Sequence, residues 1–332
     1  MTLDIAIVGM GGIGNRHARV YEKLKDRCKI VAVCDIIRER ADKAARDYGA
    51  KAFYSVREML ASGIRIDAAS MATAGVENGG DHYTPTMELL GAGIPTLGEK
   101  PISNEIDKAE EMVALARKKN LPYAIDLNHR FTPAAKRAKE WIGAGRLGQL
   151  HLINMRMWIS NPKETSPWFH MRALHPHSID VMRYFCGDVV AVHAFLSKGK
   201  GRTIWSNAQV GMKFANGVVG SLTGSYDAGG SFGLEICDIA GSEGRFLLED
   251  ACAHLTFFPR RSKEVERYDY IGGMMGFDET FDSRIGCWVD QLLAKTPADQ
   301  IEASGLEALK AQKVIEAAIR SHNENCIVEV KY

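Results

Sequence analysis

The chain has 332 residues, of which 46% are hydrophobic and 25% are charged. That length is too great for one ordinary hydrophobic core and predicts two domains of an ordered, soluble protein. The 42 basic and 41 acidic residues leave a formal charge of +1, and no stretch gathers enough basic side chains to predict a nucleic acid partner.

The seven cysteines are scattered and odd in number, and several lie inside apolar runs, as Cys34 does. We expect them to be reduced core residues, and because no zinc-type spacing occurs we expect no metal. The first strand pattern begins at Ile5, which leaves no room for a secretory signal, and no apolar run reaches the length of a membrane span. These features predict a cytoplasmic protein without a membrane partner.

Up to about residue 128, apolar strand patterns alternate with helical patterns, which predicts a doubly wound parallel sheet covered by helices, that is, a Rossmann domain. Ser55 and Glu58 have the spacing of a capping box and predict the start of one helix. The six expected strands are Ile5–Val8, Ile30–Cys34, Lys51–Tyr54, Ala68–Met71, Pro95–Gly98 and Tyr123–Leu127.

A helix over Pro133–Ile142 is followed by long runs with period-two alternation, which predict an open, mostly antiparallel sheet. The change of pattern places the boundary between a domain of residues 1–125 and one of residues 126–332. The expected elements of the second domain are a strand over His151–Met157, a hairpin joining Ala208–Phe214 to Val218–Ser225 through Asn216-Gly217, a turn over Gly241–Gly244 and a terminal helix over Leu306–Arg320.

A glycine motif, Gly9-Met10-Gly11-Gly12-Ile13-Gly14, lies between the first strand and a helical run. In this context the first glycine allows a tight turn, the second allows close approach of a pyrophosphate, and the third allows the helix to pack on the strand. The phosphates would meet the positive end of the helix dipole. Gly9, Gly11, Gly12, Ile13 and Gly14 are therefore expected to bind a dinucleotide.

Asp35 ends the second strand about 20 residues later. A carboxylate at this position can accept hydrogen bonds from both ribose hydroxyls, and it would repel a 2′-phosphate. This favours NAD over NADP, although Arg38 and Arg40 are near enough to weaken the preference. The alternatives are a glycine turn that binds no ligand, and an Asp35 that only caps a helix.

Further motifs give the chain a resemblance to a known family. Gly98-Glu99-Lys100-Pro101 follows the fifth strand, and similar landmarks occur along most of the chain: Asn128-His129-Arg130-Phe131 with Pro133, Gly145–Gly148, His177-Ser178-Ile179-Asp180, Gly241–Gly244 and Gly305–Leu309. Together these resemble the Gfo/Idh/MocA oxidoreductases. The resemblance implies substrate bound between the second-domain sheet and the nicotinamide, and a hydride exchanged with a sugar or cyclitol hydroxyl carbon.

Two residues are expected to carry that chemistry. Lys100, at the carboxyl end of a Rossmann strand, can donate to the reacting oxygen and stabilise alkoxide charge. His177 matches the histidine that the resemblance implies as acid and base. The family also places an aspartate four residues before this histidine, where this chain has Ala173. His175 or Arg172 is expected to take over part of that role, or the natural reaction differs from simple alcohol oxidation.

Other candidates are weaker, and each has a structural alternative such as core packing or helix capping. On the cofactor side they are Thr73, His82, Glu99 and Asn128. On the substrate side they are Arg156, Trp158, Trp168 and Arg172, of which the tryptophans could face a sugar ring. Asp180, one helical turn after His177, could orient the region through a hydrogen bond.

Two other classes of function compete. The first is a redox-neutral enzyme, a lyase or glycosidase-like catalyst that recycles NAD. The second is a non-catalytic sensor, which the presence of both Lys100 and His177 disfavours. An open antiparallel sheet would leave one face uncovered in a monomer, so we expect a homodimer or homotetramer. The substrate, the carbon and the direction of reaction are not encoded in any spacing rule.

Overall fold

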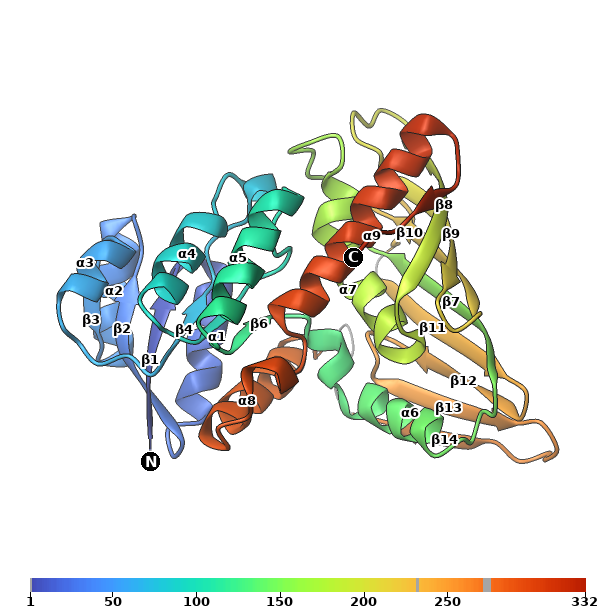
Figure 1. Cartoon of the computed structure of the whole chain (residues 1–332), viewed down its shortest axis with the longest axis horizontal. Coiled ribbons are helices and arrows are strands. Elements are labelled where there is room, and N and C mark those ends of the chain that lie inside the picture. The colour runs from blue at the N-terminus through green and yellow to red at the C-terminus, as the bar shows by residue number, and fades with distance from the viewer. Residues whose placement is uncertain (1, 231–232, 271–275) are drawn as a thin grey trace. The chain divides into compact units, whose positions relative to one another are not determined.

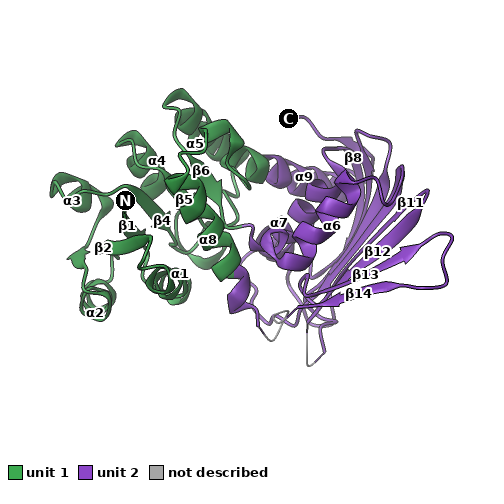
Figure 2. Cartoon of the chain, turned by 90° about the horizontal axis from the view of Figure 1, so that it is seen from below, with its two compact units in different colours: residues 1–126, 281–309 green, residues 127–280, 310–332 purple. Residues whose placement is uncertain are grey.

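The computed structural model describes residues 2–230, 233–270 and 276–332. The chain forms two compact units (Figure 2). Unit 1 contains residues 1–126 and 281–309, and unit 2 contains residues 127–280 and 310–332. The sequence pattern had placed residues 281–309 with the second domain, whereas their contacts place them with the first.

Unit 1 is built on a six-stranded parallel sheet in the order β3-β2-β1-β4-β5-β6, which confirms the predicted Rossmann domain. Figures 1 and 2 show helices on both faces of this sheet. The strands are β1 (Leu3–Val8), β2 (Cys28–Cys34), β3 (Lys51–Phe53), β4 (Ala68–Met71), β5 (Thr96–Gly98) and β6 (Tyr123–Ile125). The helices are α1 (Gly12–Lys23), α2 (Arg38–Tyr48), α3 (Val56–Ala61), η1 (Val76–Asn78), α4 (Tyr83–Gly91) and α5 (Ile106–Lys118).

The expected helix start at Ser55 is confirmed with one change. The Ser55 hydroxyl accepts a hydrogen bond from the Glu58 N–H at 3.1 Å. The Glu58 carboxylate reaches back to the N–H of Tyr54 at 3.0 Å, one residue before the Ser55 N–H of a standard capping box. The first bond satisfies a donor of the first turn of α3, and the second satisfies the N–H of the residue before its N-cap.

Residues 281–309 join unit 1 at its edge strand β6. The Arg284 guanidinium, from α8 (Asp278–Leu293), donates to the Ile125 carbonyl at 3.1 Å, and the Ile125 N–H donates to the Ala303 carbonyl at 2.9 Å. An edge strand leaves backbone groups without ladder partners, and these bonds satisfy two of them. The local pattern of apolar residues does not indicate that a segment so late in the chain packs against the first sheet. The short helix η3 (Ala298–Gln300) lies in the same segment.

Unit 2 contains a nine-stranded sheet in the order β14-β13-β12-β11-β7-β10-β9-β8-β15. The strands are β7 (Leu150–Trp158), β8 (Val189–Ser197), β9 (Asn207–Phe214), β10 (Val219–Ser225), β11 (Leu234–Gly241), β12 (Gly244–Glu249), β13 (His254–Pro259), β14 (Glu266–Asp269) and β15 (Val328–Glu329). The helices are η2 (Asn128–Phe131), α6 (Pro133–Gly143), α7 (Phe169–Cys186) and most of α9 (Gly305–Glu324).

The expected antiparallel pairing holds for most of this sheet, but β7 is an exception. It pairs antiparallel with β11 and parallel with β10. Alternation of apolar and polar residues reports that one face of a strand is buried, and it does not report the direction of the neighbour. The sheet is therefore mostly antiparallel and mixed at β7.

The predicted hairpin is confirmed between β9 and β10, but its turn differs from a two-residue one. Only Gly217 of the pair Asn216-Gly217 has a positive φ, at 89°. The Gly217 N–H donates to the Phe214 carbonyl at 3.1 Å, and the Phe214 N–H donates to the Val218 carbonyl at 2.9 Å. This is a three-residue loop whose last residue has the left-handed backbone conformation. That conformation favours glycine at position 217, where the sequence has it.

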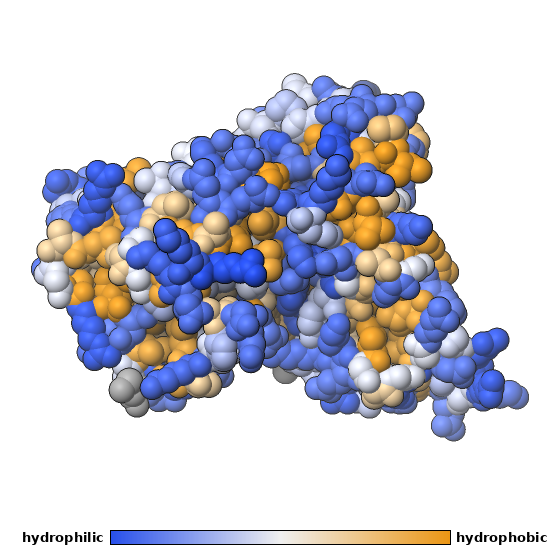
Figure 3. Space-filling model, in the orientation of Figure 1, coloured by the Kyte–Doolittle hydropathy of each residue, from blue (hydrophilic) through white to orange (hydrophobic). Residues whose placement is uncertain are grey.

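The two faces of the nine-stranded sheet differ. Helices α6, α7 and α9 cover one face, where the core of unit 2 lies, and no helix of the described residues lies on the other face (Figure 2). Leu152, Val219 and Phe195 lie on this open face and are 47%, 48% and 58% exposed. Figure 3 shows apolar patches interspersed with hydrophilic ones over the strands of unit 2. Within the described ranges, every helix is too short or too polar to cross a bilayer.

Candidate active site

The glycine turn after β1 is sterically required at two of its positions. Gly9 has a φ of +91°, and a β-carbon there would lie 2.6 Å from the Thr73 backbone nitrogen. A β-carbon on Gly14 would lie 1.8 Å from the Gly9 carbonyl oxygen. At Gly11 and Gly12, by contrast, an added β-carbon would meet open space. The outer glycines thus close the turn, while the middle ones leave room for a ligand at the N-terminus of α1.

A pocket of about 590 Å³ in unit 1 adjoins this turn. Asp35 lies in the wall of this pocket. One carboxylate oxygen of Asp35 accepts a hydrogen bond from the N–H of Met10 at 2.7 Å, and the other accepts one from the N–H of Ile37 at 2.8 Å. Each oxygen keeps a lone pair for a ribose hydroxyl, so the residues present fit a dinucleotide. Of the expected cofactor residues, the pocket is lined by Gly9, Gly11, Gly12, Ile13, Asp35 and Thr73.

The two arginines near Asp35 differ in their contacts. The Arg38 guanidinium lies over the Tyr54 ring, 4.1 Å from its centroid, whereas Arg40 lines the pocket. Only Arg40 is thus in position to approach a nucleotide, and the Asp35 carboxylate lies in the same wall. This arrangement favours a ribose with free hydroxyls over one with a 2′-phosphate.

His82, an expected cofactor residue, lies outside that lining. Its Nδ1 is 2.7 Å from the Pro101 carbonyl oxygen, and its Nε2 is 3.0 Å from the Thr73 carbonyl oxygen. Both ring nitrogens therefore bind backbone, and the ring joins the loop after β4 to the segment that contains Lys100. The Lys100–Pro101 peptide bond is cis.

Glu99, the residue before Lys100, belongs to a buried ionic cluster that the sequence pattern did not indicate. His17 Nε2 is 3.0 Å from Glu99 Oε1 and 3.3 Å from Asp126 Oδ2, and its Nδ1 is 3.0 Å from the Ser70 hydroxyl. Burial alone would lower the pKa of His17, but hydrogen bonds to Asp126 and Glu99 outweigh it and raise the pKa to about 9. Burial raises the pKa of Asp126, whereas the hydrogen bond to His17 outweighs burial and lowers the pKa of Glu99, so the imidazolium is paired chiefly with Glu99.

This cluster changes how Glu99 and Lys100 are understood. Glu99 is buried and bound to His17, so it supports the strand end and is not aimed at a cofactor. Burial lowers the pKa of Lys100, and the nearby carboxylates of Glu99 and Asp126 oppose that shift. The ligand atoms of His17, Glu99 and Asp126 lie within 4.8 Å of one another, with the His17 ring between the two acids.

In unit 2, His177 lies within α7, directly after Pro176. The proline lacks the N–H that would bond the Arg172 carbonyl four residues earlier, so the helix is locally loosened at this point. His177 is 7% exposed, and its ring stacks on that of His129, with centroids 4.2 Å apart and planes 15° apart. His129 Nδ1 in turn lies 2.8 Å from Glu235 Oε1.

The two residues expected to replace the missing aspartate are bound elsewhere. His175 is fully buried, with Nε2 3.1 Å from His170 Nε2 and Nδ1 3.1 Å from the Ser178 hydroxyl, and burial lowers its pKa well below the usual value. Arg172 forms two hydrogen bonds of 2.8 Å with Glu316. Ala173 packs against an apolar cluster. In this structure His175 is therefore a core residue and not a group that touches substrate.

The remaining substrate candidates do not gather around His177. The Ser178 hydroxyl on α7 donates to Met157 Sδ at 3.3 Å, so Met157 faces the helices, and the strand alternation turns Arg156 and Trp158 toward the open face. Trp168 stacks on Trp205 with centroids 5.9 Å apart. The positions of Arg156, Trp158 and Trp168 therefore do not support a role in binding a sugar.

Asn128 and Asp180 also have definite partners. The Asn128 amide, expected to contact the cofactor, donates to the Thr280 hydroxyl at 2.6 Å. Asp180 pairs with Arg130, whose Nε donates to Asp180 Oδ2 at 2.7 Å, and both side chains are buried. Asp180 thus ties α7 to η2, which brings His177 next to His129.

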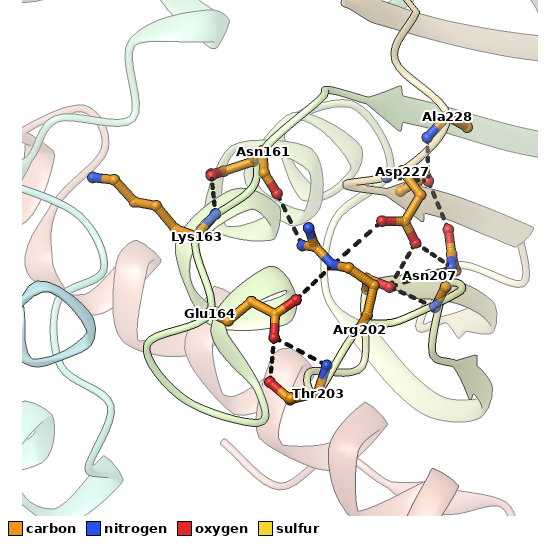
Figure 4. A network of polar contacts seen from close by, with 11 residues as sticks. Asn161, Lys163, Glu164, Arg202, Thr203, Asn207, Asp227 and Ala228 are labelled. Atoms are coloured by element: carbon orange, nitrogen blue, oxygen red, sulfur yellow. Dashed lines mark hydrogen bonds and ion pairs between the residues drawn. The ribbon is translucent and has the colours of Figure 1, made fainter.

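A polar network holds the loop that leads from β7 into α7 (Figure 4). Arg202 Nε lies 3.0 Å from Glu164 Oε1 and 3.4 Å from Asp227 Oδ1, and its guanidinium donates to the Asn161 carbonyl at 2.9 Å. Asp227 also accepts from the Asn207 amide at 2.8 Å. The entrance to α7 is therefore fixed by charged contacts rather than by a regular element.

The parallel sheet, the glycine turn, the acid at the end of β2 and the pocket beside them define a dinucleotide-binding protein of the dehydrogenase class. Two family models match the chain. The oxidoreductase family with an NAD-binding Rossmann fold matches residues 3–127, and the Gfo/Idh/MocA C-terminal domain matches residues 135–247. The chain belongs to the Gfo/Idh/MocA oxidoreductase family, which confirms the resemblance, and NAD is its cofactor.

Named relatives are similar to this chain at modest identity. Inositol 2-dehydrogenase of Rubrobacter xylanophilus is 25% identical over 96% of this chain and 91% of its own length. D-glucoside 3-dehydrogenase of Escherichia coli is 27% identical, but the match spans only 46% of this chain and 43% of that protein. A solved structure of levoglucosan dehydrogenase with NADH and L-sorbose superposes with a TM-score of 0.87 at 20% identity, covering 100% of both chains, which shows a shared fold.

Proposed function

We propose that this enzyme transfers a hydride between NAD and a hydroxyl-bearing carbon of a sugar or cyclitol, with Lys100 and His177 acting on the same hydroxyl group. The observation that carries the proposal is the placement of Lys100 at the carboxyl end of β5, in the same Rossmann unit as a pocket fitted to a dinucleotide. The names of the relatives, inositol 2-dehydrogenase and D-glucoside 3-dehydrogenase, support the substrate class.

Each residue has a distinct part in the reaction. Bound NAD supplies the nicotinamide ring that exchanges the hydride. The Lys100 ammonium donates to the reacting oxygen and stabilises its developing negative charge. His177 takes the hydroxyl proton when the alcohol is oxidised and returns it in the reverse direction. Because burial lowers the pKa of Lys100, its ammonium should be lost, and activity with it, at a pH below the 10.5 of an ordinary lysine.

The test is a panel of sugars and cyclitols assayed for NADH by absorbance. With the substrate found, His177→Ala should lose about 10²- to 10⁴-fold in rate while NAD binding, measured by fluorescence, stays unchanged. His193→Ala, a histidine on β8 in the same unit, is the matched control and should keep full activity. Near-full turnover by His177→Ala would remove that residue from the mechanism, and product without net NADH would instead indicate a redox-neutral enzyme.

We also propose that the chain assembles as a homodimer or homotetramer through the open face of the nine-stranded sheet. Leu152 and Val219 are register neighbours on β7 and β10, and both are about half exposed on that face. Covering paired apolar side chains with a second copy would remove their surface from water. We further propose that the enzyme works in the cytoplasm, which cell fractionation can check.

A further inference from the structure

Glu235 and His129 form a buried acid–histidine pair that the reaction as described does not use. Their side chains are each 3% exposed, and Glu235 Oε1 lies 2.8 Å from His129 Nδ1. The other carboxylate oxygen of Glu235 and the Nε2 atom of His129 are buried and have no hydrogen-bond partner in the described part of the chain. Burying a carboxylate so incompletely paired costs stability, which calls for a functional reason.

The hydrogen bond fixes the state of the His129 ring. An ionised carboxylate only accepts, so Nδ1 of His129 carries the proton and donates it to Glu235. In the neutral ring Nε2 then carries the lone pair. The flat face of this ring lies against His177, with centroids 4.2 Å apart. The stacking holds the plane of one ring parallel to that of the other.

Several titratable and charged groups of the described residues lie on the elements packed around His177. On α7 itself, His175 is buried and its pKa is lowered, so it is neutral. From η2, Arg130 is already paired with Asp180. The strands beneath α7 present apolar side chains, among them Met155, Met157 and Leu222. The Glu235 carboxylate, acting through His129, is therefore a negative charge placed to influence His177.

We propose that Glu235 and His129 are positioning residues for His177, and that together they replace the aspartate whose expected place is taken by Ala173. This inference rests on the proposed role of His177 and deepens it. The His129 ring holds the plane of His177, and Glu235 supplies the negative charge that an aspartate would have supplied from α7 itself.

The proton and electron balance of the step is simple. The substrate O–H bond breaks, and its proton forms an N–H bond on His177, which becomes an imidazolium. The carbon-bound hydrogen leaves as a hydride with its electron pair, so the substrate is oxidised and NAD is reduced. No proton joins or leaves His129 or Glu235 in this step. The new positive charge on His177 is stabilised by the carboxylate, with no proton passing between the stacked rings.

The first test needs no substrate. The Cε1–H proton resonance of His177, assigned by its loss in His177→Gln, is titrated by NMR in the wild type and in Glu235→Gln. Removing the negative charge should move the midpoint to lower pH by about one unit, because the imidazolium loses its stabilising partner. Asp238→Asn, the same chemical change on β11 at an open-face position, should leave the midpoint unchanged. An unchanged midpoint in Glu235→Gln would overturn the inference.

The second test measures catalysis. In Glu235→Gln, kcat should fall at least tenfold, KM should change little, and the acid limb of the pH profile should move to lower pH. Glu235→Asp, which restores the charge, should recover part of kcat. Should Glu235→Gln unfold, His129→Gln keeps a donor for the carboxylate and removes the ring, and it should show the same loss of kcat with NAD binding intact. A wild-type kcat in either folded variant would overturn the inference.

The two proposals fail in different ways. If His177→Ala keeps its activity, the proposed function of His177 is wrong, whatever the NMR titration shows. If His177→Ala is inactive but Glu235→Gln matches the wild type in both titration and kcat, only the positioning role is wrong.

Discussion

The buried cluster of His17, Glu99 and Asp126 depends on the charge of its histidine. His17 holds Glu99 and Asp126 together, and Glu99 is the residue directly before Lys100. Hydrogen bonds to Asp126 and Glu99 raise the pKa of His17 to about 9, whereas an ordinary histidine has a pKa of 6.5. A group whose pKa is raised on folding stabilises the fold fully below its unfolded value, and the contribution is lost as pH rises through the folded value.

We therefore expect the free energy of unfolding to fall by about 3 kcal/mol from this site as pH rises from below 6.5 to above 9. Urea denaturation across that range measures the loss. The NMR titration of His17, assigned by comparison with His17→Gln, should have its midpoint near 9. A midpoint near 6.5 would show that the imidazole is neutral in the folded protein at neutral pH.

Residues that act through local geometry could be read from the sequence, and residues that act through long-range contacts could not. The glycine turn and Asp35 depend on a strand, a turn and a helix that follow one another, and Gly9, Gly11, Gly12 and Asp35 line one pocket of unit 1. His129 and Glu235 are 106 residues apart, and no spacing rule joins them. A usable signal did exist for His17, a polar residue three positions after Gly14 on the face of a helix that must pack against the sheet.

At the scale of elements, α7 reaches its place because β10 has a glycine beneath it. A β-carbon on Gly224 would lie 2.0 Å from His175 Nε2 and 2.9 Å from His170 Nε2. Both histidines are fully buried and hydrogen-bonded to each other. The close approach of helix and strand therefore fixes the rotation of α7 and, with it, the direction of His177.

Gly224→Ala should destabilise the protein by about 1–3 kcal/mol, because the added methyl group must displace a buried ring. The matched control is Gly211→Ala on the neighbouring strand β9, where the nearest atom to an added β-carbon is 3.8 Å away. That variant should stay within about 0.5 kcal/mol of the wild type. Urea midpoints compare the two, and equal midpoints would contradict the close packing described for α7.

Elements were predictable where one physical pattern dominates. All six Rossmann strands were expected within two residues of their observed ends at both termini, because each is a short buried run between turn residues. The direction of β10 relative to β7 was not predictable, because alternation is the same for parallel and antiparallel neighbours. Helix α7 carries an internal proline at Pro176, which weakens the local helical signal.

At the scale of the molecule, the open face of the nine-stranded sheet should decide the state of assembly. In a symmetric dimer each substitution is present twice at the interface. Val219→Glu should therefore shift the protein toward monomer in light scattering, by placing two negative charges among apolar side chains. Val76→Glu, at a 53% exposed position of unit 1, should leave the mass unchanged. A wild type that is monomeric in dilute solution would contradict the proposal itself.

The chain passes between its two units at residues 126/127, 280/281 and 309/310. The backbone groups of Ile125 find their partners in Arg284 and Ala303, which lie 159 and 178 residues further along the chain. A fragment cut after Asp126 would keep the glycine turn and lack these partners. The edge of the nucleotide-binding sheet is therefore completed by a segment that is made only after most of unit 2.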